Sequence, residues 1–126
     1  MGKATTNTVL DAALSLLKSS ADAVNVCTSE PTTYLQATST YNLATGAITS
    51  ADWTGPADSS AGGRKVTFDG KASISVTSSG TAAHVAWTKA SGTLLYCVTT
   101  CSSQVLTSGN SVTVPGSIVI AIDDPT

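Results

Sequence analysis

His84 is the only histidine in this chain of 126 residues, so it is the only side chain whose ordinary pKa lies near neutrality. A nucleophilic reaction would need a Cys or Ser beside it, and three cysteines and eighteen serines are available by type. No GxSxG turn or comparable motif marks one of them as a nucleophile. His84 lies in a stretch of alternating apolar and polar residues, so we expect it on a strand face with a local hydrogen bond. We therefore predict no catalytic residue and no enzymatic activity.

The sequence also lacks the motifs of metal, phosphate and paired-carboxylate sites. The eight Asp and Glu residues show neither the spacing of a paired catalytic site nor that of a calcium loop. No CxxC pair is present that would join His84 in a zinc site. Gly62-Gly63-Arg64-Lys65 resembles half of a phosphate-binding loop but does not complete GxxxxGKS or GxxxxGKT. We expect no cofactor, no metal and no small-molecule substrate.

Cys27, Cys97 and Cys101 are an odd number of cysteines, so they cannot all pair within one chain. In an extended strand Cys97 and Cys101 would lie about 13 Å apart, whereas a tight hairpin would allow a disulfide between them. Proteins assembled in the cytosol keep their thiols reduced. We expect three reduced and buried thiols, because a free Cys behaves as a small hydrophobic residue.

Hydroxyl side chains dominate the composition, with twenty-one threonines and eighteen serines. Only 11% of the residues are charged, against about 25% in an average soluble protein. A surface with so few charges associates readily and suits a protein that partners cover. The same composition also fits an ordinary domain whose hydroxyl groups keep it soluble.

The charge pattern and the hydropathy exclude two classes of partner. The basic residues are scattered apart from Arg64-Lys65, which argues against direct binding of nucleic acid. No apolar run approaches the roughly 18 residues of a membrane span. Residues 1–6 lack the apolar core of a signal peptide, so we expect a protein made in the cytoplasm.

Residues 1–20 predict one short helix. Asn7 or Thr8 is expected to cap its start. Asp11 and Lys18 suit the positive and negative ends of the helix dipole. Apolar residues recur at helical spacing and form one broad face: Val9, Leu10, Ala13, Leu14, Leu16 and Leu17. A helix of about three turns is marginal alone, so it must pack on a sheet or on a neighbouring subunit.

Beyond residue 22 the apolar residues alternate with a period of two, which indicates strands. Strands are expected over 23–28, 64–68, 72–77, 82–89, 93–98, 104–106, 112–114 and 118–122. Asp69-Gly70 is expected to be a turn, and residues 34–41 allow a helical turn.

Residues 42–63 contain several Gly, Pro and Ser residues and are expected to form a long irregular segment with one short strand near Ala47-Ile48. The whole chain, 1–126, is predicted to be a single, mainly β domain. It would consist of a short N-terminal α-helix and a β-rich body over 23–122, folded as an antiparallel β-sandwich or open barrel.

Six residues are candidates for a protein interface. Trp53 and Pro56 lie in the irregular segment, and aromatic residues are enriched at interface centres. The alternative is that Trp53 packs on its own domain, as we expect for Trp87. The other four candidates lie on the predicted helix and are Val9, Leu10, Leu14 and Leu17.

Five short segments, in order along nearly the whole chain, carry a family resemblance. They are 7–17 (NTVLDAALSLL), 26–34 (VCTSEPTTY), 63–67 (GRKVT), 79–86 (SGTAAHVA) and 102–110 (SSQVLTSGN). Together they resemble small virion structural proteins of tailed bacteriophages. Cys97, Cys101 and Pro115 depart from that pattern. The resemblance implies a β-rich particle component without catalytic residues.

The resemblance further implies a capsid decoration (cement) protein, made in the host cytoplasm and bound to the outer surface of the head. Its partners would be the major capsid protein and further copies of the chain, and a trimer would suit a three-fold site on a shell. Residues 42–63 are the first candidate for an arm that reaches a neighbour, and the N-terminal helix is the second. The alternatives are a neck, tail or fibre-attachment protein of the virion and, in a different class, a carbohydrate-binding β-sandwich.

Overall fold

The computed structural model describes residues 6–60 and 62–123, and in this part of the chain the protein is mainly β with one α-helix. The helix is α1 (Asn7–Ser20). The strands are β1 (Ala23–Cys27), β2 (Asn42–Ala47), β3 (Trp53–Asp58), β4 (Arg64–Phe68), β5 (Lys71–Ser75), β6 (Gly80–Lys89), β7 (Leu94–Leu106), β8 (Ser111–Val114) and β9 (Ile118–Ile122). A π-helical turn covers Gln36–Thr40 and a 3-10 turn covers Ser50–Asp52. The predicted fold class, with its N-terminal helix and antiparallel sheets, is confirmed.

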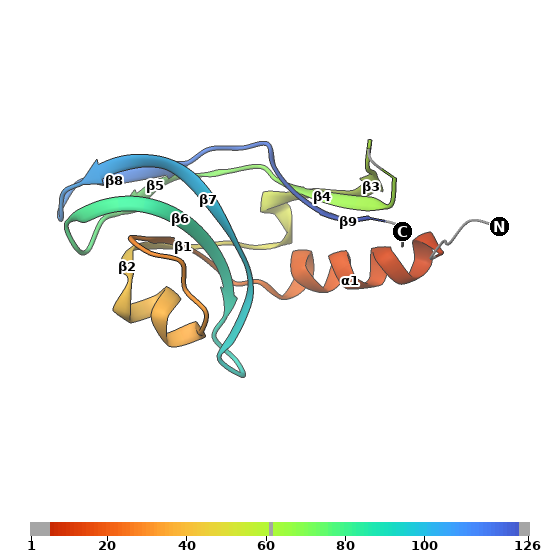
Figure 1. Ribbon diagram of the computed structural model, residues 1–126, viewed down its shortest axis with the longest axis horizontal. Helices are drawn as coiled ribbons and strands as arrows, with labels where there is room; N and C mark the ends of the chain where they lie inside the picture. Colours follow the sequence, from red (N-terminus) through yellow and green to blue (C-terminus); the bar gives the residue numbers. More distant parts are fainter. Residues whose placement is uncertain (1–5, 61, 124–126) are drawn as a thin grey trace.

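The strands form three antiparallel sheets that divide the molecule into a body and a lobe. The body contains the four-stranded sheet A, in the order β2-β1-β6-β7, and the β5–β8 ribbon, sheet C. Sheet A curves over sheet C, and the bridge between Ala44 and Val76 joins their sides (Figure 1). Valines from sheet A and Ile74, Val76 and Val114 from the other layer share one core. The body is therefore sandwich-like, with its hydrophobic core between the two layers.

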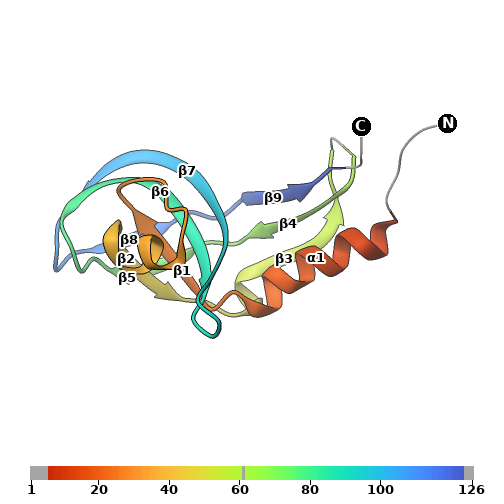
Figure 2. The same cartoon turned by 60° about the horizontal axis from the view of Figure 1, so that its bottom comes forward.

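The lobe consists of the three-stranded sheet B, in the order β3-β4-β9, with α1 packed along one face. It extends from the body, so that the molecule is elongated (Figure 2). The chain passes between the two parts four times, and in two of these passages one strand leads almost directly into the next, from β4 to β5 and from β8 to β9. Asp69-Gly70, predicted to be a turn, is the point where the first of them passes from sheet B to sheet C.

Two glycines allow the paired strands to touch at this passage. A Cβ atom on Gly70 would lie 2.8 Å from the Gly116 nitrogen, and one on Gly116 would lie 2.7 Å from the Asp69 oxygen. Gly70 also has a φ of 97°, which L side chains rarely adopt. The two connecting segments therefore lie directly side by side where they pass between the lobe and the body.

Three aromatic rings pack together where the lobe meets the body. Trp53 and Phe68 come from sheet B and Trp87 from sheet A, with ring centroids 5.1 to 5.7 Å apart. All three are buried, at 3%, 0% and 0% exposure. The prediction for Trp87 is confirmed, whereas the prediction of Trp53 as a contact aromatic is wrong. Trp53 begins β3 and pairs with Phe68 across the sheet, which turns its ring into the core.

The prediction of an irregular segment over 42–63 is also wrong. This stretch contains β2, the 3-10 turn and β3. Asp52 and Thr49 close the 3-10 turn through a reciprocal capping box, with Thr49 N donating to Asp52 Oδ2 over 2.9 Å. Gly55-Pro56, which suggested a loop, lies within β3, where the register shifts between Thr54 and Ala57. An edge strand tolerates such a proline, because a strand needs no backbone N–H donor on the side that faces solvent.

The N-cap of the helix is Thr6, one residue before Asn7, the first of the two predicted caps. Thr6 occupies the N-cap position without a side-chain cap, and Val9 N donates to Thr6 O over 3.0 Å. Asp11 pairs with Arg64 on β4, with Nε–Oδ1 and Nη2–Oδ2 distances of 2.7 and 3.2 Å. Lys18 Nζ donates to Gly55 O over 2.8 Å. Both helix charges are therefore directed toward sheet B.

The chain also covers part of the outer face of sheet A. The segment with the π-helical turn lies over β1, and Cys27 and Ala37 share a small second core there. Asn25, fully buried in β1, donates to Thr88 Oγ1 over 2.9 Å and accepts from Thr45 Oγ1 over 2.9 Å. These bonds satisfy the amide that the covering segment removes from water.

Candidate interface surfaces

Cys27 and His84 face each other across β1 and β6, so they are the one Cys–His neighbourhood that the register brings together in the described residues. The Cys27 thiol is wholly buried and donates to Ala37 O over 3.5 Å. Burial, with a smaller contribution from Cys101, raises the pKa of the Cys27 thiol to about 11. A nucleophilic thiol needs a lowered pKa and access, and this one has neither.

The expected local hydrogen bond of His84 does not involve its buried Nδ1, which has no partner among the described residues. The ring lies in a strand, as expected, and is half-buried. No group of three or more His, Cys, Asp or Glu residues suited to a metal ion occurs within 6–60 and 62–123. The arrangement around His84 therefore carries no recognisable acid–base or metal chemistry.

Cys97 and Cys101 lie in the same strand, β7, and all three cysteines are free. The strand is continuous over 94–106, where two separate strands had been expected, because it pairs with β6 along its length through two register shifts. Burial raises the pKa of Cys97 to about 12 and also raises the pKa of Cys101. Cys27 is buried as predicted, whereas Cys97 and Cys101 are only half-buried.

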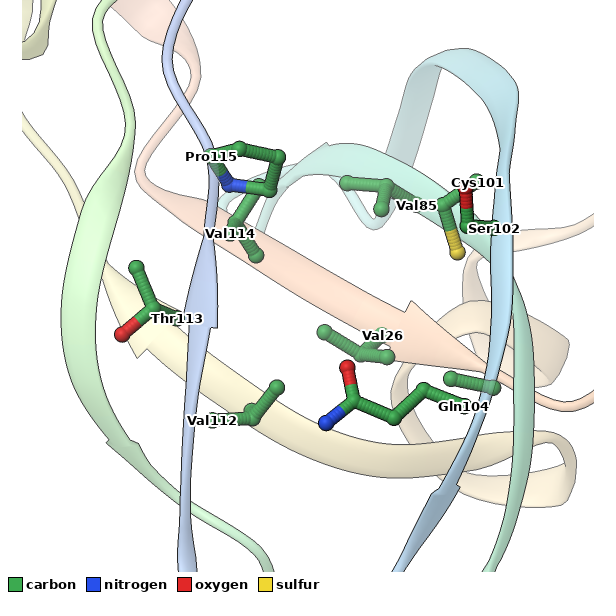
Figure 3. A pocket seen from close by; sticks show the side chains of 10 residues that line it. Val26, Val85, Cys101, Ser102, Gln104, Val112, Thr113, Val114 and Pro115 are labelled. Atoms are coloured by element: carbon green, nitrogen blue, oxygen red, sulfur yellow. The ribbon is translucent and has the colours of Figure 1, made fainter.

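A cavity of about 270 Å³ lies between β7 and β8, which follow each other in the chain but are not paired in a sheet. Figure 3 shows Val26 and Val85 at its back and the polar Gln104 at its side. The lining residues are mainly apolar: Val26, Ala82, Val85, Cys101, Ser102, Gln104, Val112, Thr113, Val114 and Pro115. None of these ten lining residues carries a charge.

The helix α1 has two apolar faces with different environments. Leu10, Leu14 and Leu17 are buried against the lobe, at 5%, 2% and 8% exposure. These three predicted interface residues serve the chain's own core and are not available to another molecule. On the neighbouring flank of the helix, Val9 and Leu16 are 59% and 55% exposed, and Ala12 and Ala13 between them are exposed too. We call Val9, Ala12, Ala13 and Leu16 the outer helix face.

The outer helix face carries no charge, because Asp11 and Lys18 both turn toward sheet B. Of the six predicted interface residues, Val9 lies on this face. Pro56 is half-buried in β3, and its carbonyl accepts a bond of 3.4 Å from Arg64 Nη2. Leu16 is exposed beside Val9 but was not among the six candidates, because a broad apolar face does not reveal which half meets the sheet.

The edge strands β7, β8 and β9 form further uncharged surface, including the edge of sheet B. Between Ala90 and Ile122 the sequence contains no Asp, Glu, Lys, Arg or His, and this stretch forms β7, β8 and β9. Each of the three sheets ends at one of these strands. Val105 on β7 and Val119 on β9 are 76% and 50% exposed. The sequence shows that this stretch has no charged residues, but it does not show that its strands lie at the sheet edges.

In comparisons with known proteins, no family model, no curated protein and no solved structure matches the chain. No helix within the described residues has both the length and the apolar character needed to cross a membrane.

Proposed function

We propose that this protein is a bacteriophage virion structural protein, and specifically a capsid decoration (cement) protein on the outer surface of the head. The proposal rests first on the resemblance carried by five segments spread along the chain. It also draws on the scarcity of charge and on the absence of a recognisable catalytic constellation in the residues described. Its proposed partners are the major capsid protein and further copies of the chain.

The observation that carries the proposal is the pair of uncharged apolar surfaces on the lobe, the outer helix face and β9. In the described part of the chain, Val9, Leu16 and Val119 on the lobe are three of the six large apolar residues that are exposed. Exposed apolar residues that lie together mark interaction sites. Both surfaces lie on the lobe, which extends away from the body (Figure 2). A cement protein needs more than one contact surface, because it must connect neighbouring subunits of the shell.

The position of the contact differs from the one expected from the sequence. Residues 42–63 are not a free arm, so we assign the capsid contact to the second candidate, the N-terminal helix. Its outer face presents Val9 and Leu16 around the small residues Ala12 and Ala13. Small residues between larger ones permit close approach of another backbone or helix.

The alternatives differ in what supports them. A neck, tail or fibre-attachment protein would share the same apolar surfaces and differs in where it is bound. A carbohydrate-binding module commonly presents an aromatic ring to the sugar; Trp53 and Trp87 are buried in the aromatic cluster, whereas Tyr34, Tyr41 and Tyr96 are half-buried. We favour the virion assignment because the sequence resemblance supports it and nothing comparable supports sugar binding.

Quantitative electrophoresis of purified particles, with heads and tails separated, tests the proposal. We expect the protein in the head fraction, at a copy number comparable to that of the major capsid protein or a simple fraction of it. A small, ring-sized copy number, or a location confined to the tail, would contradict the cement assignment. Specific binding of the isolated protein to a glycan would favour the carbohydrate-binding alternative.

The same particles test the assignment of the helix. Leu16→Glu places a charge on the outer helix face and should reduce incorporation into heads. Leu94→Glu is the matched control, because Leu94 is a similarly exposed leucine, at 45%, but lies on the body. Equal incorporation of the two variants would contradict the contact through α1.

A further inference from the structure

Strand β9 is an unprotected edge of sheet B. It consists of Ile118-Val119-Ile120-Ala121-Ile122 and pairs with β4 on one side. Within the residues that the structure describes, no strand pairs with its other side. An edge strand presents free backbone N–H and C=O groups, and natural proteins usually protect such edges with charges, proline or a covering segment. The five residues of β9 include neither charge nor proline.

The hydrophobic layer beneath sheet B remains open at this edge. Val66 and Phe68 on β4 are wholly buried, whereas their partners on β9, Ile120 and Ile118, are only half-buried. These side chains share the face that packs against α1, so the difference in burial follows from their position in the sheet. One more strand beside β9 would cover the isoleucines laterally and pair its backbone groups.

The opposite edge of sheet B is protected. Strand β3 contains Pro56, which has no N–H to donate, and ends at Asp58, which pairs with Arg64. A ring in which β9 of one copy pairs with β3 of the next is therefore disfavoured. A two-fold arrangement, in which β9 meets β9, avoids the proline altogether and uses the same apolar strand from both copies.

We propose that two copies of this chain associate by antiparallel pairing of their β9 strands about a two-fold axis through Ile120. In this register Ile118 lies opposite Ile122 of the second copy, and Val119 lies opposite Ala121 of the second copy. The isoleucines of both copies then share one face, and the two sheets B form one six-stranded sheet with both helices on that face.

The charges at the strand ends are compatible with this register. Asp123 follows β9 and would lie opposite Ser117 of the second copy, so the two acidic ends do not meet. The symmetric pairing brings no other charge into the strand contact, because residues 90–122 have none. Self-association through this edge therefore meets no like-charge repulsion.

The β9 pairing would be the contact between copies in the homo-oligomer of the proposed function, and it rests on that function in this respect. The homo-oligomer would then be a two-fold dimer and not the trimer that a three-fold site suggests. The outer helix face remains free in this dimer for the major capsid protein. Because the test below uses the purified protein without particles, its failure would leave the virion assignment standing.

Light scattering coupled to size-exclusion chromatography of the purified chain tests the pairing. The wild type should have twice the chain mass at high concentration. Val119→Lys and Ala121→Glu place a charge on the strand at exposed positions, and each should weaken self-association roughly tenfold or more. Val105→Lys is the matched control, because it puts the same charge on the exposed edge strand of sheet A and should leave the dimer intact.

Mixing the two variants tests the register itself. Position 119 of one chain would lie opposite position 121 of the other, so the Val119→Lys and Ala121→Glu chains should form a mixed dimer held by an ion pair. A monomeric or trimeric wild type would overturn the proposal, as would dissociation by Val105→Lys instead of Val119→Lys. A mixture that stays monomeric would overturn the register. Circular dichroism and the unfolding midpoint confirm that each variant is folded.

Discussion

Cys27 and His84 lie side by side on neighbouring strands, and the Cys27 thiol is buried. The Cys27 thiol is enclosed between sheet A and the segment that covers it, and it donates to Ala37 O. The residue types alone allowed a nucleophile and a base. The burial of Cys27 depends on residues 28–41 folding back over β1, and no local sequence pattern around His84 indicates that fold.

The raised pKa of Cys27, about 11 against an ordinary value of 9, gives a prediction at this scale. The native state holds the thiol proton more tightly than the unfolded state, so the stabilisation is complete below pH 9 and is lost as pH rises from 9 toward 11. Across that window the free energy of unfolding should fall by up to about 1.4 kcal/mol per pH unit through this group.

Urea unfolding of the wild type and of Cys27→Ala, at several pH values between 7 and 11, measures the effect. The substitution lowers stability at every pH through lost packing, but it should also make the pH dependence above 9 shallower. The other ionisable groups are common to both proteins, so the difference between the two slopes isolates the thiol. Parallel slopes would contradict the buried, protonated state of Cys27.

At the scale of elements, α1 connects the core of the lobe with its surface. Its inward face carries Leu14, which is 2% exposed, and its outward face carries Leu16, which is 55% exposed. The ion pair of Asp11 with Arg64 and the bond of Lys18 to Gly55 hold the helix in this orientation. The two leucines are therefore chemically identical residues in opposite environments on one element.

Substitution of these leucines tests the orientation of α1. Leu14→Ala removes buried methyl groups and leaves a cavity, so it should lower the free energy of unfolding by about 3 kcal/mol, within a range of 2–5. Leu16→Ala removes side-chain atoms from water and should change it by about 0.5 kcal/mol or less. Chemical denaturation of the two variants gives both values. Similar losses in the two variants would mean that the helix is rotated from the orientation described.

The periodicity of the sequence predicted α1 and the positions of β1, β4, β6 and β9, because alternating burial leaves a direct mark on the residue pattern. It did not predict β3, where Gly55 and Pro56 resemble a loop although Trp53 is drawn into the core by Phe68 and Trp87. Nor did it predict the partition into three sheets, because strand pairing depends on contacts between distant residues. Of the candidate interface residues, Val9 is exposed, while Leu10, Leu14 and Leu17 required the sheet to be placed before their burial was evident.

At the scale of the whole molecule, connecting segments of the chain and the aromatic cluster join a sandwich-like body to an elongated lobe. Two of these segments lie side by side at Gly70 and Gly116. A link through several contacts suits a protein proposed to hold neighbouring subunits together. The proposed β9 pairing would extend sheet B across two copies and leave an outer helix face on each copy.

The central claim is that the protein cements the capsid, and the thermal disruption temperature of purified heads tests it most directly. Heads that lack the protein are mixed with increasing amounts of the wild type, and bound protein and disruption temperature are measured together. We predict saturable binding and a disruption temperature that rises with occupancy, because shell dissociation must then also break the bridging contacts. Heads that bind no protein, or that bind it to saturation with an unchanged disruption temperature, would contradict the claim.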